Sequence, residues 1–351
     1  MTVSRRPVVG APAWRLRAGP VRLRVRRRTV WVCAAAVVAC LMLATAALML
    51  GRLPLGVGDV LAVLTGQTDG FHRTVVLEWR APRAVAAVVF GAALGVAGAM
   101  FQSITRNALA SPDVLGVSTG AYTGALLMMI VAGGGTAAAA GGALVGAVAA
   151  SAAVYLLAFR SGVQGNRLVI VGIAVTAMLT SFNTWLILAA ELDAAVSAAV
   201  WGQGDLSGAA WGGTAPGVAV IAVLLLTATL LAPGLRQLDL GDDAAAGSGV
   251  AVERTRLRVM AVAVGLTAVV TALAGPVAFI ALAAPQIARR VMRAPGVPLA
   301  GAAVFGAVLL LVSDLVAQHV VPTVLPVGIV TVVVGGSYLV WLLIEEARRR
   351  L

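Results

Sequence analysis

Residues 240–250 read Leu240-Gly241-Asp242-Asp243-Ala244-Ala245-Ala246-Gly247-Ser248-Gly249-Val250, and they lie in the longest polar interruption between the apolar segments that follow the N-terminus. Membrane-length apolar segments flank this stretch on both sides. Most of its side chains are small enough to enter a narrow cleft of another protein. We therefore interpret it as a docking element that faces the cytosol.

The composition is typical of a helical membrane protein with many spans. Hydrophobic residues make up 60% of the 351 residues, charged residues make up 11%, and 40 residues are glycine. A soluble domain could not bury this much apolar surface. Because about 20 apolar residues cross the hydrocarbon layer as a helix, the chain has room for about ten transmembrane helices. We predict an all-α polytopic fold with spans at residues 30–50, 84–102, 114–131, 137–159, 168–190, 215–231, 259–273, 277–291, 299–318 and 326–344.

The chain divides into an N-terminal arm and one membrane domain. Residues 1–29 are rich in arginine and proline, which predicts a basic, disordered cytosolic arm. We predict that residues 30–351 form a single transmembrane domain and that residues 233–258 form a cytosolic segment containing the docking element.

The arginines indicate the topology. All 26 basic residues are arginine; with ten spans and a cytosolic N-terminus, 22 of them lie in cytosolic segments, and only Arg52, Arg73, Arg80 and Arg83 lie outside. This asymmetry follows the positive-inside rule, so the net charge of +12 indicates membrane topology rather than nucleic-acid binding. We predict a multi-pass protein of the cell membrane with both termini in the cytosol.

The absence of lysine excludes a P-loop ATPase. A Walker A loop needs a lysine to reach the phosphates of ATP, so any ATP that drives transport is hydrolysed by a separate subunit. The two histidines, His72 and His319, and the two cysteines, Cys33 and Cys40, follow no metal-ligand spacing, and we predict no metal site and no bound cofactor. An intramembrane enzyme is disfavoured because the chain lacks an H-E-x-x-H motif and a convincing Ser/His or paired-Asp arrangement.

Six motifs occur in an order that resembles the FecCD family, the permeases of ABC importers for iron-siderophores, haem and cobalamin. Arg80-Ala81-Pro82-Arg83 resembles the family's R-x-P-R, and residues 106–116 resemble R-N-P-L-A-x-P-x-x-L-G. The remaining four motifs are W-x-x-G-S-L-S-G at residues 201–208, L-G-E-x-x-A-x-x-L-G-V at residues 240–250, G-x-I-x-F-x-G-L-x-x-P-H-x-x-R at residues 275–289 and L-P-x-G at residues 325–328. The resemblance covers nearly the whole chain.

The resemblance implies a type II ABC importer permease with inverted repeats. Its implied function is import of an iron-siderophore complex, with haem or cobalamin import as alternatives. Its implied partners are ABC ATPase subunits, an extracytoplasmic substrate-binding protein, membrane lipids, and a second copy of the permease or a paralogous permease. A stand-alone secondary transporter is an alternative of another class. Such proteins usually carry ionisable residues within their spans, and here only Asp314 is close to one.

The resemblance also assigns the contact with the ATPase. In the family, the element at residues 240–250 is a pair of short helices that enters a cleft of the ATPase, and Asp242 and Asp243 are expected to cap the first helix. The assigned coupling residues are Leu240, Gly241, Asp242, Asp243, Ala245, Gly249 and Val250. A flexible linker is the alternative interpretation, because Gly247-Ser248-Gly249 is typical of linkers.

Two further sets of residues are candidate sites. Arg80 and Arg83 lie three residues apart on one helical face outside the membrane, and the resemblance assigns them to docking of the binding protein, with headgroup contact as the alternative. Gln102, Asn107 and Asn183 are candidates for the translocation path, although buried amides also join helices to one another. Gly91 and Gly95 form a small-xxx-small pair, which predicts close approach of another helix.

Several residues depart from the family pattern. Ala108 stands where the family usually has proline, Asp205 where it has serine, Ser248 where it has leucine and Gln286 where it has histidine. Gln318 replaces an arginine expected shortly after Asp314. From Gln286 and Gln318 we predict that the chain is the diverged half of a pair and that its partner is a paralogous permease. The chelate that is carried is left open by the sequence.

Overall fold

The computed structural model describes most of the chain. The described residues are 13–18, 21–51, 53–68, 70–158, 165–294, 296, 298–320 and 323–350.

An antiparallel pair of strands precedes the first long helix. β1 (Ala13–Ala18) pairs with β2 (Val21–Arg26), with Ala13 opposite Arg26. β2 leads directly into α1 (Arg27–Met49). These strands lie within the arm that was predicted to be disordered, whereas residues 1–12 and 19–20 of that arm lie outside the described residues.

Helices make up the rest of the described secondary structure. In chain order after α1 they are α2 (Val57–Leu64), α3 (Phe71–Arg73), the π-helix η1 (Thr74–Arg80), α4 (Ala81–Thr105), the 3-10 helix η2 (Pro112–Leu115), α5 (Val117–Leu126), the π-helix η3 (Leu127–Val131), α6 (Thr136–Ala158), α7 (Gly165–Ala189), α8 (Leu192–Trp201), α9 (Trp211–Leu238), α10 (Asp242–Gly247), α11 (Val252–Ala274), α12 (Ile280–Met292), α13 (Leu299–His319) and α14 (Val327–Arg350).

Every predicted span overlaps a helix, but the helices differ in length. Within the described ranges, seven are long and apolar enough to cross a membrane: Arg27–Met49, Phe71–Thr105, Thr136–Ala158, Arg167–Ala189, Trp211–Leu238, Val252–Ala274 and Leu299–His319. The apolar parts of two more predicted spans, Val117–Val131 and Val327–Leu342, are shorter. α12 has 13 residues. It therefore rises about 20 Å, which is less than the roughly 30 Å of a hydrocarbon layer.

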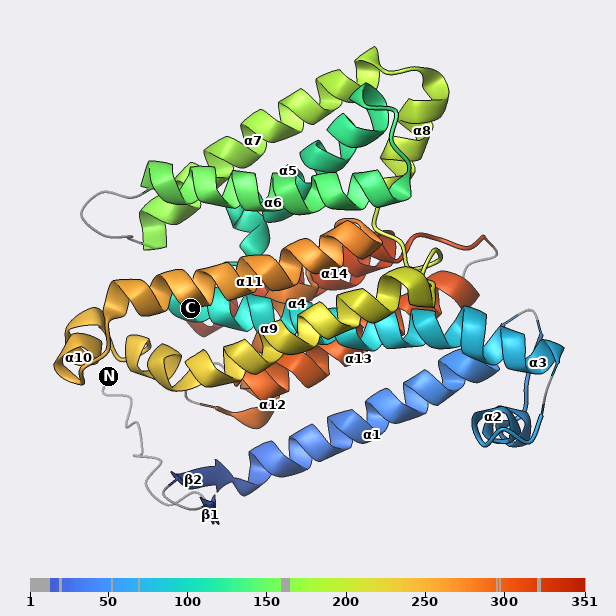
Figure 1. Cartoon of the computed structure of the whole chain (residues 1–351). Coiled ribbons are helices and arrows are strands. Elements are labelled where there is room, and N and C mark those ends of the chain that lie inside the picture. Colours follow the sequence, from blue (N-terminus) through green and yellow to red (C-terminus); the bar gives the residue numbers. More distant parts are fainter. Residues whose placement is uncertain are drawn as a thin grey trace.

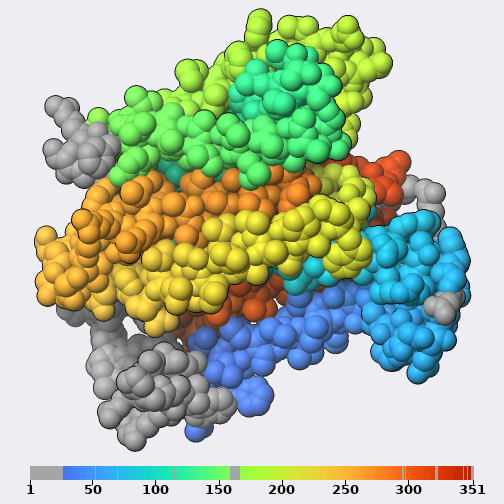
Figure 2. Space-filling model, in the orientation of Figure 1, coloured from blue at the N-terminus to red at the C-terminus, as the bar shows by residue number. Residues whose placement is uncertain are grey.

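The helices form two groups (Figure 1). α5, α6, α7 and α8 lie together on one side, and the second group is built around α4, which packs against α9, α11, α12 and α13. The continuous helix that contains α4 is the most buried of the seven long apolar helices. α10 lies at one end of the second group, beside the junction of α9 and α11 (Figures 1 and 2).

Glycine pairs bring helices into backbone contact in both groups. A Cβ added at Gly91 or Gly95 of α4 would meet the main-chain carbonyl of Gly306 or Ala302 on α13. The predicted small-xxx-small contact is therefore confirmed, and its partner is α13. Gly120 and Gly124 of α5 approach Gly146 and Gly142 of α6 in the same way.

Candidate functional site

The stretch at residues 240–250 folds as a short helix held between two glycines. α9 ends at Leu238, Gly241 has φ of 119°, and α10 then runs from Asp242 to Gly247. Gly249 has φ of 85°, after which α11 begins at Val252. Both angles lie in the region that favours glycine, so the two glycines allow the chain to reverse on each side of α10. The segment is a short helix with defined ends. This structure favours a docking element over a flexible linker.

The residues of α10 differ in how exposed they are. Ala245 is fully buried against its own chain, and the amide of Val250 donates to its carbonyl at 3.0 Å. Ala244 and Ala246 are exposed, and Leu240 is 71% exposed just before the helix. Ala245 therefore anchors α10, and its exposed neighbours are available for contact. The assignment of Ala245 to the contact with the ATPase stays a prediction.

Asp242 is the centre of an ion-pair network. Its carboxylate accepts hydrogen bonds from Arg106 at 2.5 Å and from Arg256 at 3.0 Å, and Arg256 also contacts Glu253 at 3.3 Å. Desolvation acts to raise the pKa of Asp242, but the hydrogen bond and charge of Arg256, with the charge of Arg106, outweigh it and lower the pKa. The expected helix cap is not formed, because neither Asp242 nor Asp243 makes a side-chain hydrogen bond to the first turn of α10.

The network joins α10 to the end of α4. Arg106 follows α4 with φ of 50° and also donates to the carbonyl of Leu238 at 3.1 Å. The hydroxyl of Ser103 donates to the carboxylate of Asp239. Two motifs that lie more than 120 residues apart, at 106–116 and 240–250, thus meet at one surface.

Two of the three amides predicted for the translocation path have local partners. Gln102 is buried and donates to the carbonyl of Leu282 at 3.1 Å, so it joins α4 to α12. Asn107 is exposed, and its side-chain oxygen accepts from the amide of Leu109 at 2.9 Å, which closes a turn after α4. These contacts favour structural roles for both residues. The third amide, Asn183, lines a pocket that is described below.

Two of the departures from the family pattern are in contact. The buried side chain of Gln286 on α12 donates a hydrogen bond to the carbonyl of Ala108. The sequence alone could not reveal this contact, because the two residues are 178 positions apart.

At the other end of the bundle, Arg80 and Arg83 are engaged by their own chain. Arg80 donates to the carbonyls of Leu48, Met49 and Leu53 at distances between 2.7 and 3.2 Å. Arg83 binds the buried carboxylate of Asp314 at 2.8 Å. Both guanidinium groups are therefore engaged within the chain, and docking of the binding protein through them stays a prediction.

Gln318 belongs to the same cluster. Its amide donates to the second oxygen of Asp314 at 2.6 Å, so Asp314 is bound by Arg83 and Gln318 together. The hydroxyl of Ser207 lies 3.4 Å from Arg83 and accepts a weak hydrogen bond from it. The residue that replaces the family's arginine thus completes the coordination of a buried carboxylate.

Three motifs meet near Arg83. The amide of Asp205 donates to the carbonyl of Ala274 at 2.7 Å, and the amide of Gly328 donates to the carbonyl of Gly204 at 3.0 Å. A Cβ at Gly275 would meet the carbonyl of Trp201. The motifs at 201–208 and 325–328 and the start of the motif at 275–289 therefore form one packed surface at the end of the bundle opposite α10.

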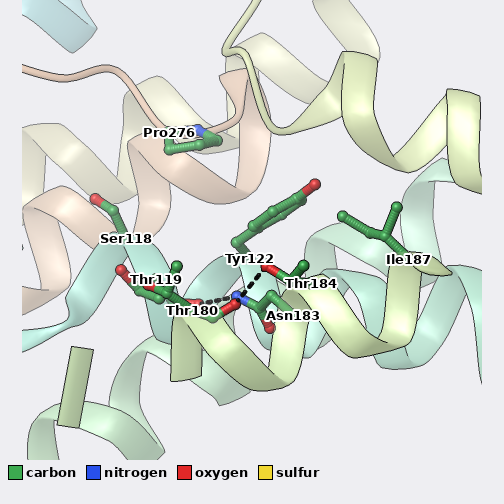
Figure 3. A pocket seen from close by; sticks show the side chains of 8 residues that line it. All are labelled: Ser118, Thr119, Tyr122, Thr180, Asn183, Thr184, Ile187 and Pro276. Atoms are coloured by element: carbon green, nitrogen blue, oxygen red, sulfur yellow. Dashed lines mark hydrogen bonds between the residues drawn. The ribbon is translucent and has the colours of Figure 1, made fainter. Parts of the chain in front are cut away.

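A pocket of about 210 Å³ lies between α5, α7 and Pro276 (Figure 3). Its side chains come from Ser118, Thr119, Tyr122, Thr180, Asn183, Thr184, Ile187 and Pro276. Asn183 is 3% exposed, and its Nδ2 donates to the carbonyl of Thr119 at 3.4 Å. Its Oδ1 is buried and has no hydrogen-bond partner.

The sequence is similar to known transport proteins over most of its length. Residues 37–345 match the model of the FecCD transport family. The chain is 48% identical to the ferric enterobactin transport system permease protein FepG of Escherichia coli (strain K12), over 93% of this chain and 99% of that protein. It is 35% identical to the Fe(3+) dicitrate transport system permease protein FecD of the same strain, over 81% of this chain and 90% of the relative.

The fold is also similar to a solved transporter. A structure described as an inward-facing conformation of a metal-chelate type ABC transporter superposes with a TM-score of 0.80, covering 90% of this chain and 99% of that chain. The sequences are 22% identical, so this likeness bears on the fold alone. It confirms the predicted architecture.

Proposed function

Because this chain belongs to the FecCD transport family, we propose that the iron chelate it carries is ferric enterobactin. The chain is the membrane-spanning permease of an ABC importer for iron-siderophore complexes, and ATP is hydrolysed by a separate subunit. The choice among chelates rests on one observation, which is the 48% identity to the ferric enterobactin permease over nearly the full length of both chains.

The exposed surface around α10 is the proposed contact with the ATPase. Leu240, Ala244 and Ala246 present one apolar and two small side chains at the end of the bundle. Small side chains allow another protein to approach the helix backbone closely. The Asp242 network ties α10 to α4 and α11, so a displacement of α10 would be passed to both helices.

The proposed partners at the other end are an extracytoplasmic binding protein and a paralogous permease. The surface formed by residues 201–208, 274–277 and 325–328, with Arg80 and Arg83 beside it, is the proposed docking site for the binding protein. A paralogous second permease is supported by Gln286 and Gln318, which depart from the family pattern at buried or partly buried positions.

The test is uptake by the complete transporter. The chain is reconstituted in proteoliposomes with its ATPase, its binding protein and its second permease, and accumulation of ⁵⁵Fe is measured with ferric enterobactin or ferric citrate outside. We expect ATP-dependent accumulation of ferric enterobactin and none of ferric citrate. The matched control carries an ATPase whose Walker A lysine is replaced. Uptake of ferric citrate in place of ferric enterobactin would contradict the proposed substrate.

A further inference from the structure

The ion-pair network around Asp242 continues beyond α10 to the other group of helices. Arg256 is its least exposed charged member, with 12% of its side chain exposed, and its two terminal nitrogens bind different carboxylates. Nη2 donates to Asp242 at 3.0 Å, and Nη1 donates to Oε2 of Glu253 at 3.3 Å. The hydroxyl of Tyr155 on α6 donates to the other oxygen of Glu253, Oε1, at 3.4 Å. Tyr155 and Glu253 thereby connect α6 to the network that holds α10.

This hydrogen bond crosses from one group of helices to the other. Tyr155 lies in the last turn of α6, within the group of α5, α6, α7 and α8. Glu253 lies in the first turn of α11, within the group built around α4. The C-terminal end of α6 lies on the same side of the molecule as α10 (Figure 1). The Tyr155–Glu253 bond therefore stands between the proposed contact with the ATPase and the helices that line the pocket.

Tyr155 adds a directed contact to a network whose charges are already balanced. Two arginines, Arg106 and Arg256, are paired with two carboxylates, Asp242 and Glu253. A neutral tyrosine hydroxyl is therefore not needed to compensate any charge there. What the hydroxyl contributes is a fixed position of α6 relative to Glu253.

The remainder of the α6 surface would not fix that position well. Its buried side chains are alanines with Ser151 and Val154, and α6 packs against α11. Short side chains let two helices approach closely, whereas polar side chains join them at defined points. Tyr155 is the only aromatic residue in the sequence of α6, and it provides such a point.

A displacement of α6 would reach the pocket through α5. The glycine pairs described above bring the main chains of α5 and α6 into contact. Because the contact is between main chains, a shift of α6 is passed to α5 without rearrangement of side chains. α5 contributes Ser118, Thr119 and Tyr122 to the wall of the pocket. The shape of the pocket therefore depends on where α6 is held.

We propose that Tyr155 couples α10 to the α5–α8 group, so that a displacement of α10 by the ATPase passes through Arg256 and Glu253 to α6 and then to α5. The inference rests on the proposed contact between α10 and the ATPase. It makes Tyr155 a positioning residue for transport, which acts through Glu253 and touches neither the ATPase nor the iron chelate.

The experiment measures coupling in the complete transporter. Proteoliposomes contain the chain with its ATPase, its binding protein and its second permease, and ⁵⁵Fe uptake and ATP hydrolysis are measured on the same samples. The iron source is ferric enterobactin, or ferric citrate if the wild type imports that chelate instead. The variants are Tyr155→Phe, which removes the hydroxyl and keeps the ring, Glu253→Ala, which removes the acceptor, and the two combined.

Ser151→Ala is the matched control. Ser151 lies one turn before Tyr155 on the same helix, and its hydroxyl donates to the carbonyl of Ala147 in that helix at 2.7 Å. The control therefore removes one hydroxyl from α6 without touching the network. The thermal unfolding midpoint is measured for every variant.

We expect Tyr155→Phe to lower the uptake per ATP hydrolysed about threefold, because a 3.4 Å contact is at the weak end of hydrogen bonds. The unfolding midpoint and the rate of ATP hydrolysis should keep their wild-type values, and Ser151→Ala should change none of the three. Glu253→Ala should lower the uptake per ATP at least as much. The combined variant should fall no further than Glu253→Ala, because the two residues act through one bond.

An unchanged uptake per ATP in Tyr155→Phe, or additive losses in the combined variant, would overturn the inference. A lower uptake per ATP that comes with a lower unfolding midpoint would also overturn it, since Tyr155 would then only stabilise the fold. Ala246→Trp, on an exposed position of α10, tests the underlying contact separately. If it leaves coupling unchanged, the proposed contact fails and this inference fails with it. If Ala246→Trp uncouples transport and Tyr155→Phe does not, only the role of Tyr155 is refuted.

Discussion

Asp314 and Arg83 show how single residues are held in this membrane domain. The carboxylate of Asp314 has 1% of its side chain exposed, and the guanidinium of Arg83 reaches both of its oxygens at 2.8 to 3.1 Å. Gln318 supplies a further donor. A buried ion pair contributes little net stability when compared with an apolar pair, but loss of one partner leaves an uncompensated charge.

We expect Arg83→Gln to destabilise the folded permease by about 3–5 kcal/mol, because it leaves Asp314 buried without a counter-ion. The double variant Arg83→Gln with Asp314→Asn should recover most of this loss, since both charges are then absent. The thermal unfolding midpoint of the detergent-solubilised complex measures both effects. If the double variant is no more stable than Arg83→Gln alone, the ion pair is not the cause.

This pair also changes how docking through Arg80 and Arg83 can be tested. Charge reversal of Arg83 would place a second carboxylate beside Asp314, and charge reversal of Arg80 would disrupt contacts to three carbonyls. Slower capture of the binding protein by such variants is evidence of docking only when the unfolding midpoint is unchanged.

At the residue scale, the sequence identified the residues with notable side chains but not the partners that those side chains contact. Asp314 was recognised as the ionisable residue closest to a span, but its partner lies 231 positions away. The sequence made Asn183, Gln102 and Asn107 equal candidates for the translocation path, because all three side chains are amides. Only the fold separates an amide that joins two helices from an amide that lines a pocket, since burial and partners depend on tertiary packing.

At the element scale, α10 is the segment whose exposed face can be tested directly. Ala245 is fully buried, so a tryptophan there would overpack the contact that anchors the helix. Ala246 is exposed, so a tryptophan there would meet no part of its own chain that it must displace. The two neighbouring alanines therefore separate damage to the permease from damage to its contact with the ATPase.

We expect Ala246→Trp to leave assembly of the membrane domain intact while uptake per ATP hydrolysed falls at least severalfold. Ala245→Trp should instead reduce the amount of folded permease. Uptake and ATP hydrolysis are measured together in proteoliposomes, and yield is measured by size-exclusion chromatography. Ala137→Trp, at an exposed position of α6 far from α10 in sequence, is the control. Unchanged coupling in Ala246→Trp would mean that this face of α10 does not contact the ATPase.

The helices themselves followed from the apolar segments, but some of their ends did not. The second span was predicted to start at residue 84, whereas the helix continues from Phe71 through η1 into α4. Pro82 lies inside this continuous helix, where a proline cannot donate a backbone hydrogen bond. The helix accommodates it because η1 is a π-helix, so the hydrogen-bond register changes just before the proline, where its missing N–H is tolerated. The periodicity of apolar residues does not indicate a switch from α-helical to π-helical hydrogen bonding.

At the scale of the whole molecule, topology is the property that the arginine distribution predicts most directly. A reporter active only outside the membrane should be inactive when fused after Leu351, because 22 of the 26 arginines then lie on the cytosolic side. The same reporter inserted after Gly208 should be active. Activity assays on intact cells measure both fusions. The reverse pattern would place α10 outside, where no ATPase could reach it.

The family and the architecture were predictable from the order of six motifs, and both are confirmed. The iron-siderophore function is confirmed as well, in place of haem or cobalamin import and of a stand-alone transporter. The inverted repeats stay a prediction. The sequence could not show that the motifs gather at opposite ends. The motif at 106–116 lies beside 240–250 at one end, and the motifs at 201–208 and 325–328 lie with the start of the 275–289 motif at the other.

The reciprocal glycine contacts limit how this chain can change by mutation. An added carbon on Gly91 would meet the carbonyl of Gly306, and one on Gly306 would meet the carbonyl of Gly91; Gly120 and Gly146 are related in the same way. Because the obstacle is the main chain in each case, no replacement of the opposite side chain can make room. An ion pair such as Arg83–Asp314 can be lost and rebuilt through two successive changes. Two successive substitutions cannot restore a glycine contact in this way. The distance between the two helices is therefore fixed by the main chain of both.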